Sequence, residues 1–516
     1  MPLFALQFLN HRLPLTIAVM FAKNIALSAL LGVASAQTWR GLPGSLYGPS
    51  EPWGYAPEAS WPPTDIGKDL QPQRPDHLTS KIVAQVDQDR IGDIITKLSD
   101  FGTRHTLSTQ NSSTRGIGAA RDWIYEEMKG YAEASNGSMD VYFNSYIQPV
   151  ASRISFPVNI TNVVAQINGT TDPNRVYVVT GHYDSRRLDV MDYEGDAPGA
   201  DDDASGVAVV MEMARICAKL KPRATMIFAA VAAEEQGLYG SDNLAKTLKQ
   251  EGYNVEGNWN NDIVGTGSFQ PFSPINDYTI RLFGASILYP NASTAAEDRQ
   301  IGIIGGENDS PARNLGRFIA EVAAGASKDL DMQVALIYRP DRYLRGGDHQ
   351  SFLSQGFPAV RFTEAVEDYT HQHQNTRLDN GTQYGDLVEF VDFDYTSRVA
   401  KVNLATMWAA ANAPAMPSNV TISQRIGIPA ADEDTPLEIV NNLSAFNWTT
   451  GNDPLVASYE LVWRVSGALQ WSHSLDVGNV GGVTVDLPKD SLQFGIRAVG
   501  KDGKKSPAVF PLPAAR

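Results

Sequence analysis

RVYVVTGHYDS, residues Arg175 to Ser185, is the stretch that decides how the fold of this chain is interpreted. It begins as a run of β-branched and apolar residues, which is typical of a strand buried on both faces of a sheet. The run ends at Thr180, and His182 and Asp184 follow almost at once. In open α/β sheets the carboxyl ends of strands carry the sites, so these polar residues predict a functional site there.

The segments on either side of this strand alternate between helical and strand patterns. A helical pattern (205–220) is followed by a second buried run, ATMIFAAVAAEE, over residues 224–235. Further strands are expected near residues 255–262, 332–338 and 358–364, and further helices over residues 113–132, 311–325 and 395–411. This alternation predicts an α/β domain with a mixed, largely parallel sheet flanked by helices, over residues 81–412.

The pattern changes after ANAPAMPS, residues 411–418. Short alternating strands such as ASYELVWR and LQFGIRAVG are separated by turn signals. They predict a small all-β sandwich over residues 413–516 that resembles a fibronectin type III module.

The amino-terminal residues have the features of a processed, exported chain. Residues 1–36 are predicted to be a signal peptide that ends at Ala34-Ser35-Ala36, with Met20 as a possible true start. Residues 37–80 are rich in proline, glycine and tryptophan and form either a propeptide or an extended arm. Ten Asn-x-Ser/Thr sequons, at Asn111, Asn136, Asn159, Asn168, Asn291, Asn308, Asn380, Asn419, Asn442 and Asn447, support a secreted, extracellular glycoprotein.

Charge and cysteine content exclude several classes of function. A formal net charge of −16 argues against nucleic acid and against an anionic membrane surface as partner. Cys217 is the single cysteine, so the chain forms no internal disulfide. A cysteine metal cluster and a cysteine nucleophile are also disfavoured.

Histidines and carboxylates gather where the predicted strands end. GADDDASG, residues Gly199 to Gly206, adds three adjacent aspartates that repel one another unless cations lie between them. The candidates for the site are His182, Asp184, Asp202, Glu234, Glu235, Asp262 and His349. Imidazole and carboxylate ligands without thiolate suit zinc. One metal needs only three protein ligands, so this larger set favours two metals that share one carboxylate.

These residues also carry a family resemblance over about residues 85–412. HYDS, PGADDDASG, AAEEQGLYGS, NND and GGDHQSF, in this order, resemble the secreted co-catalytic di-zinc aminopeptidases of the leucyl-aminopeptidase type. The larger zinc metallopeptidase family also contains glutamate carboxypeptidases and glutaminyl cyclases.

The resemblance implies a role for each residue. His182 and Asp262 hold one zinc, Glu235 and His349 hold the other, and Asp202 bridges the two. Glu234 is the general base that activates a bridging metal-bound water, and Asp184 orients His182. The resemblance also implies a cis peptide bond between Asp202 and Asp203. The expected activity is hydrolysis of N-terminal residues from peptide or protein substrates.

Other interpretations stay open from the sequence. A carboxypeptidase of the same family needs basic residues for the substrate carboxylate, and Arg342 and Arg345 are candidates. A glutaminyl cyclase with one zinc is disfavoured by the five ligands, and a metal-free binding or scaffold protein by the intact ligand set with Glu234. The family's oxyanion-binding tyrosine has candidates in Tyr338 and Tyr343. His371 and His373 are interpreted as surface or supporting residues, and His105 as structural. The oligomeric state stays open.

Overall fold

We describe the protein from a computed structural model, over residues 65–514 except 268–277, 287–294, 424–442 and 452. The predicted signal peptide and residues 37–64 of the predicted arm lie outside these residues. Among the described residues no helix is both long and apolar enough to cross a membrane.

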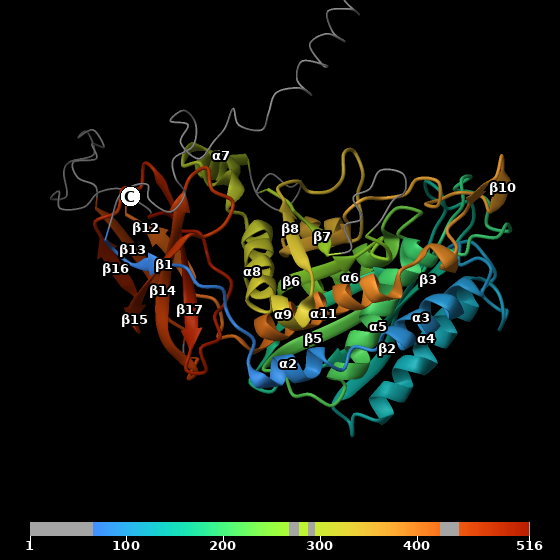
Figure 1. Ribbon diagram of the computed structural model, residues 1–516, viewed down its shortest axis with the longest axis horizontal. Helices are drawn as coiled ribbons and strands as arrows, with labels where there is room; N and C mark the ends of the chain where they lie inside the picture. The colour runs from blue at the N-terminus through green and yellow to red at the C-terminus, as the bar shows by residue number, and fades with distance from the viewer. Residues whose placement is uncertain (1–64, 268–277, 287–294, 424–442, 452, 515–516) are drawn as a thin grey trace, which may run out of the picture. The chain divides into compact units, whose positions relative to one another are not determined.

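An eight-stranded mixed sheet forms the centre of the α/β region (Figure 1). Its strands, in spatial order, are β2 (Met139–Gln148), β3 (Val158–Ile167), β5 (Ala224–Val231), β4 (Asp172–His182), β6 (Asn254–Asn261), β9 (Ala359–Glu364), β7 (Thr279–Gly284) and β8 (Gln333–Ile337). The central four, β5, β4, β6 and β9, are parallel to one another. The predicted fold class, a mixed and largely parallel sheet, is confirmed.

Two apolar cores lie on the two faces of this sheet. One core joins the sheet to α3 (Gln88–Ser99), α4 (Gly116–Glu133), α5 (Gly206–Cys217), α8 (Pro311–Gly325) and α11 (Phe393–Asn412). The other joins it to α6 (Tyr239–Gln250) and α10 (His349–Ser354). The remaining helices are α2 (His77–Val83), α7 (Ala295–Ile303) and α9 (Ser327–Leu330). With both faces of the sheet covered, β5 and β9 are buried along their whole length, which explains the largely apolar sequence of β5.

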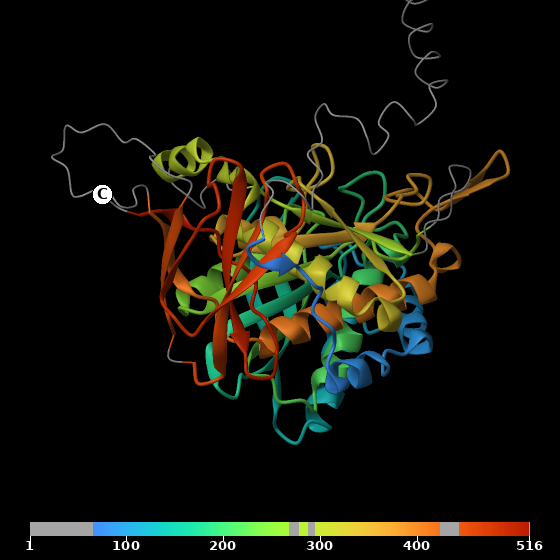
Figure 2. The ribbon, with the colours of Figure 1, turned by 60° about the vertical axis from the view of Figure 1, so that its left-hand side comes forward.

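The carboxyl-terminal region consists of two four-stranded sheets that share one core (Figure 2). One sheet has the order β1 (Lys68–Asp69), β15 (His473–Gly478), β14 (Val456–Val465), β17 (Leu492–Gly500). The other has the order β16 (Gly482–Val485), β13 (Ser444–Thr449), β12 (Ser418–Ile422), β18 (Leu512–Pro513). Trp463 and Phe494 from the first sheet pack with Phe446 from the second. The expected all-β sandwich is therefore present.

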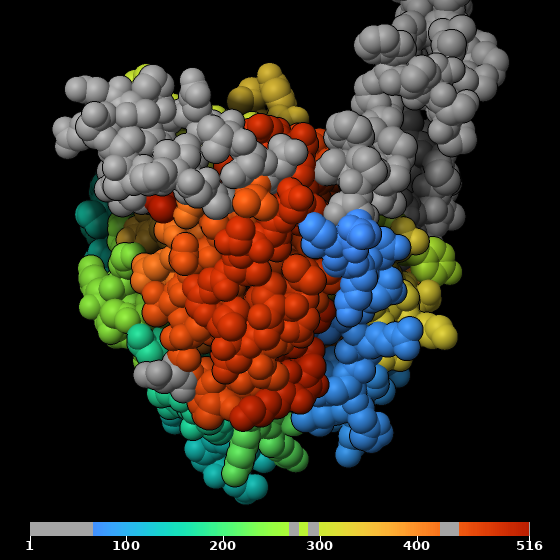
Figure 3. Space-filling model, turned by 90° about the vertical axis from the view of Figure 1, so that its left-hand side faces the viewer, coloured from blue at the N-terminus to red at the C-terminus, as the bar shows by residue number. Residues whose placement is uncertain are grey.

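The segment before α2 lies along the sandwich (Figure 3). Strand β1 pairs antiparallel with β15, and the backbone N–H of Leu70 donates to the Ser472 carbonyl at 2.8 Å. Gly67 takes a positive φ of 75°, and a Cβ there would lie 2.2 Å from the Trp463 ring. Residues 65–76 thus form an extended arm that is built into the fold.

Candidate metal centre

The site lies at the carboxyl ends of three neighbouring parallel strands. β4 ends at His182, Glu234 and Glu235 follow β5, and Asp262 follows β6. Asp202 lies in the irregular turn Ala200–Ser205, which leads into α5. Parallel strands bring their carboxyl ends to one edge of the sheet, so residues distant in the sequence meet there.

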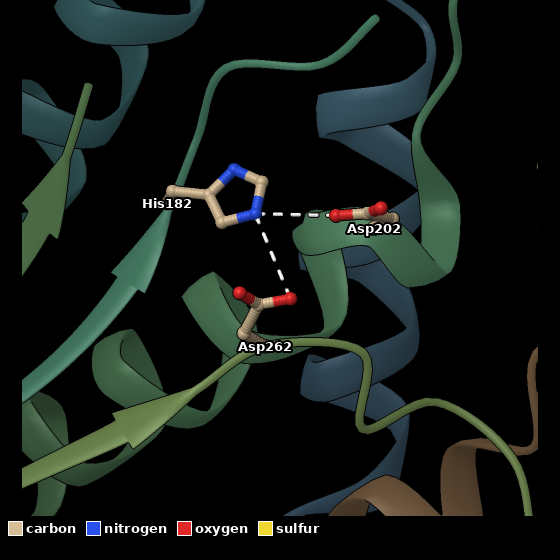
Figure 4. Close-up of side chains that lie close together, drawn as sticks. All are labelled: His182, Asp202 and Asp262. Carbon is tan, nitrogen blue, oxygen red and sulfur yellow. Dashed lines mark ion pairs between the residues drawn. The ribbon is translucent and has the colours of Figure 1, made fainter. Parts of the chain in front are cut away.

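One group of possible metal ligands consists of His182, Asp202 and Asp262 (Figure 4). His182 Nε2 lies 3.1 Å from Asp202 Oδ1 and 3.9 Å from Asp262 Oδ1. All three side chains are buried.

A second group consists of Asp202, Glu235 and His373. His373 Nε2 lies 2.8 Å from Asp202 Oδ2 and 2.9 Å from Glu235 Oε1. Asp202 thus offers one oxygen to each group, which is the arrangement of a carboxylate that bridges two cations.

The structure corrects the prediction for His349. This histidine lies outside both groups, because its Nε2 is 2.7 Å from the Pro340 carbonyl and 3.6 Å from Asp341 Oδ2. His373, which the sequence analysis interpreted as a surface or supporting residue, takes the position beside Glu235. His373 has a φ of 57° and lies in the loop between β9 and β10 (Arg377–Asp379), where no strand or helix pattern marks it.

Asp184 connects His182 to the loop that carries Glu234 and Glu235. His182 Nδ1 lies 3.0 Å from the Asp184 carbonyl and 3.5 Å from its Oδ1. The backbone N–H groups of Glu234 and Glu235 donate to Oδ1 and Oδ2 of Asp184, each at 3.2 Å. Contacts of this kind fix the orientation of an imidazole ligand. These contacts are the ones expected of a positioning residue, the role that the resemblance implies for Asp184.

The turn that carries Asp202 is held by other carboxylates. The backbone N–H groups of Asp201 and Asp202 each donate to Asp386 at 2.8 Å. Asp203 accepts from the N–H of His182 and of Gly206, each at 2.9 Å. The peptide bond between Asp202 and Asp203 is cis, as the resemblance implies.

Glu234 is half-buried beside both groups, and no side-chain hydrogen bond to another described residue ties it down. Burial raises the pKa of its carboxyl well above the usual range, and the neighbouring carboxylates of Asp262 and Glu235 raise it further. A raised pKa makes a carboxylate a better proton acceptor, which is the property that a general base needs.

The other sequence candidates have structural partners. Tyr338 donates its hydroxyl to the Leu469 carbonyl, and the Tyr343 side chain is 73% exposed. Arg342 Nη1 and Arg345 Nη1 pair with Glu367 at 2.9 and 3.0 Å. His105 is buried against the Val190 carbonyl, as expected of a structural histidine.

The donor set fits metal ions. In each group the candidate ligand atoms lie within 4.8 Å of one another, and they are imidazole nitrogens and carboxylate oxygens only. His182 Nε2 and Glu235 Oε1 are buried and make no hydrogen bond of acceptable geometry to the described residues, although Asp202 Oδ1 and His373 Nε2 lie 3.1 and 2.9 Å away. Buried polar atoms are rarely left so unless another ligand satisfies them. This chemistry suits zinc.

The fold and site together define an α/β protein with two adjoining groups of candidate metal ligands, and comparison with known proteins assigns its family. The sequence profile of peptidase family M28 matches residues 162–390. A "probable zinc metalloprotease" of Pyrenophora teres f. teres is 56% identical over 458 residues, which cover 88% of this chain and 91% of that protein. One of Pyricularia oryzae is 53% identical over 466 residues, covering 88% and 89%. The chain belongs to peptidase family M28.

Among solved structures, the LapA aminopeptidase of Legionella pneumophila is similar at 16% identity and a TM-score of 0.46. That match covers 68% of this chain and 77% of that one.

Proposed function

We propose that this M28 peptidase is a secreted, zinc-dependent aminopeptidase with two zinc ions. The observation that carries the proposal is the position of Asp202 between the two groups, with one oxygen toward His182 and the other toward His373. Asp202 would be shared by the two ions, His182 and Asp262 would hold one of them, and Glu235 and His373 would hold the other. The names of the relatives support zinc as the metal.

The residues divide the work of hydrolysis. Zinc, when bound, supplies Lewis acidity, which polarises a peptide carbonyl and lowers the pKa of water. Glu234 takes the proton of the attacking water and passes it to the leaving amine. Asp184 keeps the His182 ring and the Glu234–Glu235 backbone in place throughout.

The charges around the site favour the amino end of a substrate. Arg342 and Arg345, the candidates for a substrate carboxylate, are paired with Glu367. Glu367 already serves as the ion partner of the cations that a carboxypeptidase would need for a substrate carboxylate. A carboxypeptidase is therefore the second candidate.

Secretion and the nature of the substrate belong to the same proposal. The asparagines of several sequons, among them Asn136, Asn159, Asn168 and Asn380, are exposed and accessible for glycosylation. The sequence pattern of residues 1–36 supports export. We propose peptides or proteins as partners, with neither nucleic acid nor a membrane surface.

Matched peptides test the end specificity. The purified chain, with zinc restored, is offered a peptide with a free amino terminus, the same peptide N-acetylated, and the same peptide amidated at its carboxyl end. An aminopeptidase cleaves the first and third, and a chelator abolishes cleavage. Cleavage of the acetylated but not the amidated peptide would establish the carboxypeptidase instead.

The Glu234→Gln variant tests the general base. Glutamine keeps the size of the side chain but cannot accept the proton, so kcat should fall about 10²–10⁴-fold. Zinc content, measured on the same sample, should equal that of the wild type. Unchanged kcat would remove Glu234 from the mechanism.

A further inference from the structure

A buried arginine stands directly behind one of the candidate metal ligands. Arg361 lies in β9, which pairs in parallel with β6, and its residue partner across the ladder is Asn260. Its side chain is 0% exposed. A fully buried guanidinium is costly unless charged and polar partners surround it, so its partners indicate its purpose.

Those partners converge on the ligand Asp262. Nη2 of Arg361 lies 2.7 Å from Asp262 Oδ1, the same oxygen that faces His182 Nε2 at 3.9 Å. Nη2 also donates to the Asp262 backbone carbonyl at 3.3 Å. The guanidinium therefore fixes both the side chain and the backbone of this residue.

The second terminal nitrogen of the Arg361 guanidinium, Nη1, has partners other than Asp262. Nη1 of Arg361 donates to Asp341 Oδ2 at 3.3 Å and to the Gly346 carbonyl at 2.5 Å. Asp341 is buried and accepts from the backbone N–H of Arg342 at 2.6 Å. These contacts hold the guanidinium in place independently of its contacts with Asp262.

Gly347 leaves room for this arrangement. A Cβ at this position would lie 2.4 Å from Arg361 Nη1 and 3.1 Å from Asp262 Oδ2. The backbone of the RGGDHQSF segment thus approaches the arginine–aspartate pair as closely as a glycine allows.

We propose that Arg361, held by Asp341, is a positioning residue for the metal ligand Asp262. The proposal rests on the metal centre of the proposed function. The arginine keeps the Asp262 carboxylate aimed at the space beside His182 and offsets its repulsion with Asp202. Partners of this kind, which hold the ligand rather than the metal, typically account for about 10–100-fold in metal affinity or activity.

Zinc binding to the full chain tests this role without any measurement of catalysis. The dissociation constants are obtained by competition with a chromogenic chelator of known affinity. In Arg361→Met we expect one of the two constants to rise about 10–100-fold. Arg361→Lys keeps the charge but loses the two-nitrogen fork, so it should show a smaller rise in the same constant.

Arg317→Met is the matched control, because Arg317 is also a fully buried, ion-paired arginine. It pairs with Asp309 at 3.0 Å and contacts neither metal group. The zinc dissociation constants of Arg317→Met should stay within about twofold of the wild-type values. Its free energy of unfolding should fall, as we expect for Arg361→Met.

The outcomes separate this inference from the proposed function. Constants within about twofold of the wild type in both Arg361 variants would overturn the positioning role. If Arg361→Met does not fold, the Asp341→Asn variant is used in its place. Asp341→Asn must then raise the same zinc dissociation constant that Arg361→Lys raises. A wild-type chain that binds no zinc would instead overturn the proposed metal centre.

Discussion

Three consecutive aspartates, Asp201 to Asp203, point to three different partners. Asp201 Oδ1 accepts from the N–H of Gly265 at 2.7 Å, and Asp203 accepts from the N–H of His182. Asp202 alone faces both candidate metal groups. The outer two therefore hold the loop against β4 and the segment after β6, while the middle one is left free to bind metal.

The choice between His373 and His349 leads to a prediction at the scale of a residue. His373→Ala should remove one of two zinc ions, because the second group then keeps only Asp202 and Glu235. His349→Ala should keep both, since His349 faces Pro340 and Asp341. Elemental analysis after dialysis against a buffered low zinc concentration measures the difference. Loss of zinc from the His349→Ala variant alone would reinstate the sequence-based assignment.

The sequence could point to His182, Glu234 and Glu235 because they lie at the ends of strands with a clear apolar pattern, and to Asp262 because it ends the expected strand near residues 255–262. His373 could not be found in this way, since it lies in a loop whose path depends on tertiary contacts. One such contact is the hydrogen bond that Gln372 Nε2 donates to Asp202 Oδ2 at 3.5 Å. His349 attracted attention because it opens a helix near the site, but its ring points to Pro340.

At the scale of elements, the parallel strands were predictable and the antiparallel ones were not. β4, β5, β8 and β9 were expected from apolar or β-branched runs, and β6, whose sequence NVEGNWNN is largely polar, from a strand pattern near residues 255–262. β2 is an edge strand with several exposed side chains, and β3 and β7 pair antiparallel with neighbours that follow them by many residues. The sequence pattern of one strand does not reveal such pairing, because the pairing depends on which strand lies beside it.

Helix α2 follows the arm and packs against α11, and its N-cap residue Asp76 contacts the sandwich. Asp76 caps α2 by accepting from the Thr79 N–H at 2.7 Å, and Lys504 Nζ lies 2.7 Å from its other oxygen. Partial burial works against ionisation, but the bonds from Lys504 and Thr79 lower the pKa of Asp76 to about 2. Its stabilising effect is thus present above the unfolded value of 3.8 and is lost as the pH falls towards 2.

Asp76→Asn keeps the cap, since asparagine caps helices as well as aspartate does, but removes the charge. At pH 5 the metal-free variant should be less stable by under about 1 kcal/mol, the usual value of a solvent-screened pair. This difference should shrink between pH 4 and pH 2. Urea unfolding of both chains at pH 5 and pH 3 measures it. A difference independent of pH would show that Lys504 contributes nothing through charge.

At the scale of the whole molecule, the sandwich and the α/β region are joined by buried ion pairs. α11 ends at Asn412 and β12 begins at Ser418, and residues Pro62–Arg516 form one compact unit. Asp309, just before α8, is fully buried between Arg317 of α8 and Arg464 of β14. Arg497 of β17 pairs with Glu321 of α8 at 2.7 Å. From the sequence we expect a change to β structure after residue 412 but not this interface, because an arginine in a strand pattern is normally interpreted as exposed.

The buried contact predicts that the two regions unfold together. Arg464→Met removes one of the two cations that neutralise Asp309, and breaking a buried pair in this way costs up to about 3–5 kcal/mol. Because Arg317 remains beside Asp309, we expect a loss towards the lower end of that range. Arg377→Met, on the exposed β10–β11 (Thr382–Tyr384) hairpin, is the control and should change the stability by less than about 0.5 kcal/mol.

Urea unfolding followed by tryptophan fluorescence, and by residual peptidase activity in the same samples, measures both effects. We expect fluorescence and activity to be lost in one shared transition, whose midpoint lies at a lower urea concentration in Arg464→Met than in the wild type. This result would indicate that the sandwich stabilises the peptidase fold through Asp309. Activity that persists after the sandwich tryptophans have become exposed would show that the regions are independent. The interface would then serve only to hold the sandwich in place.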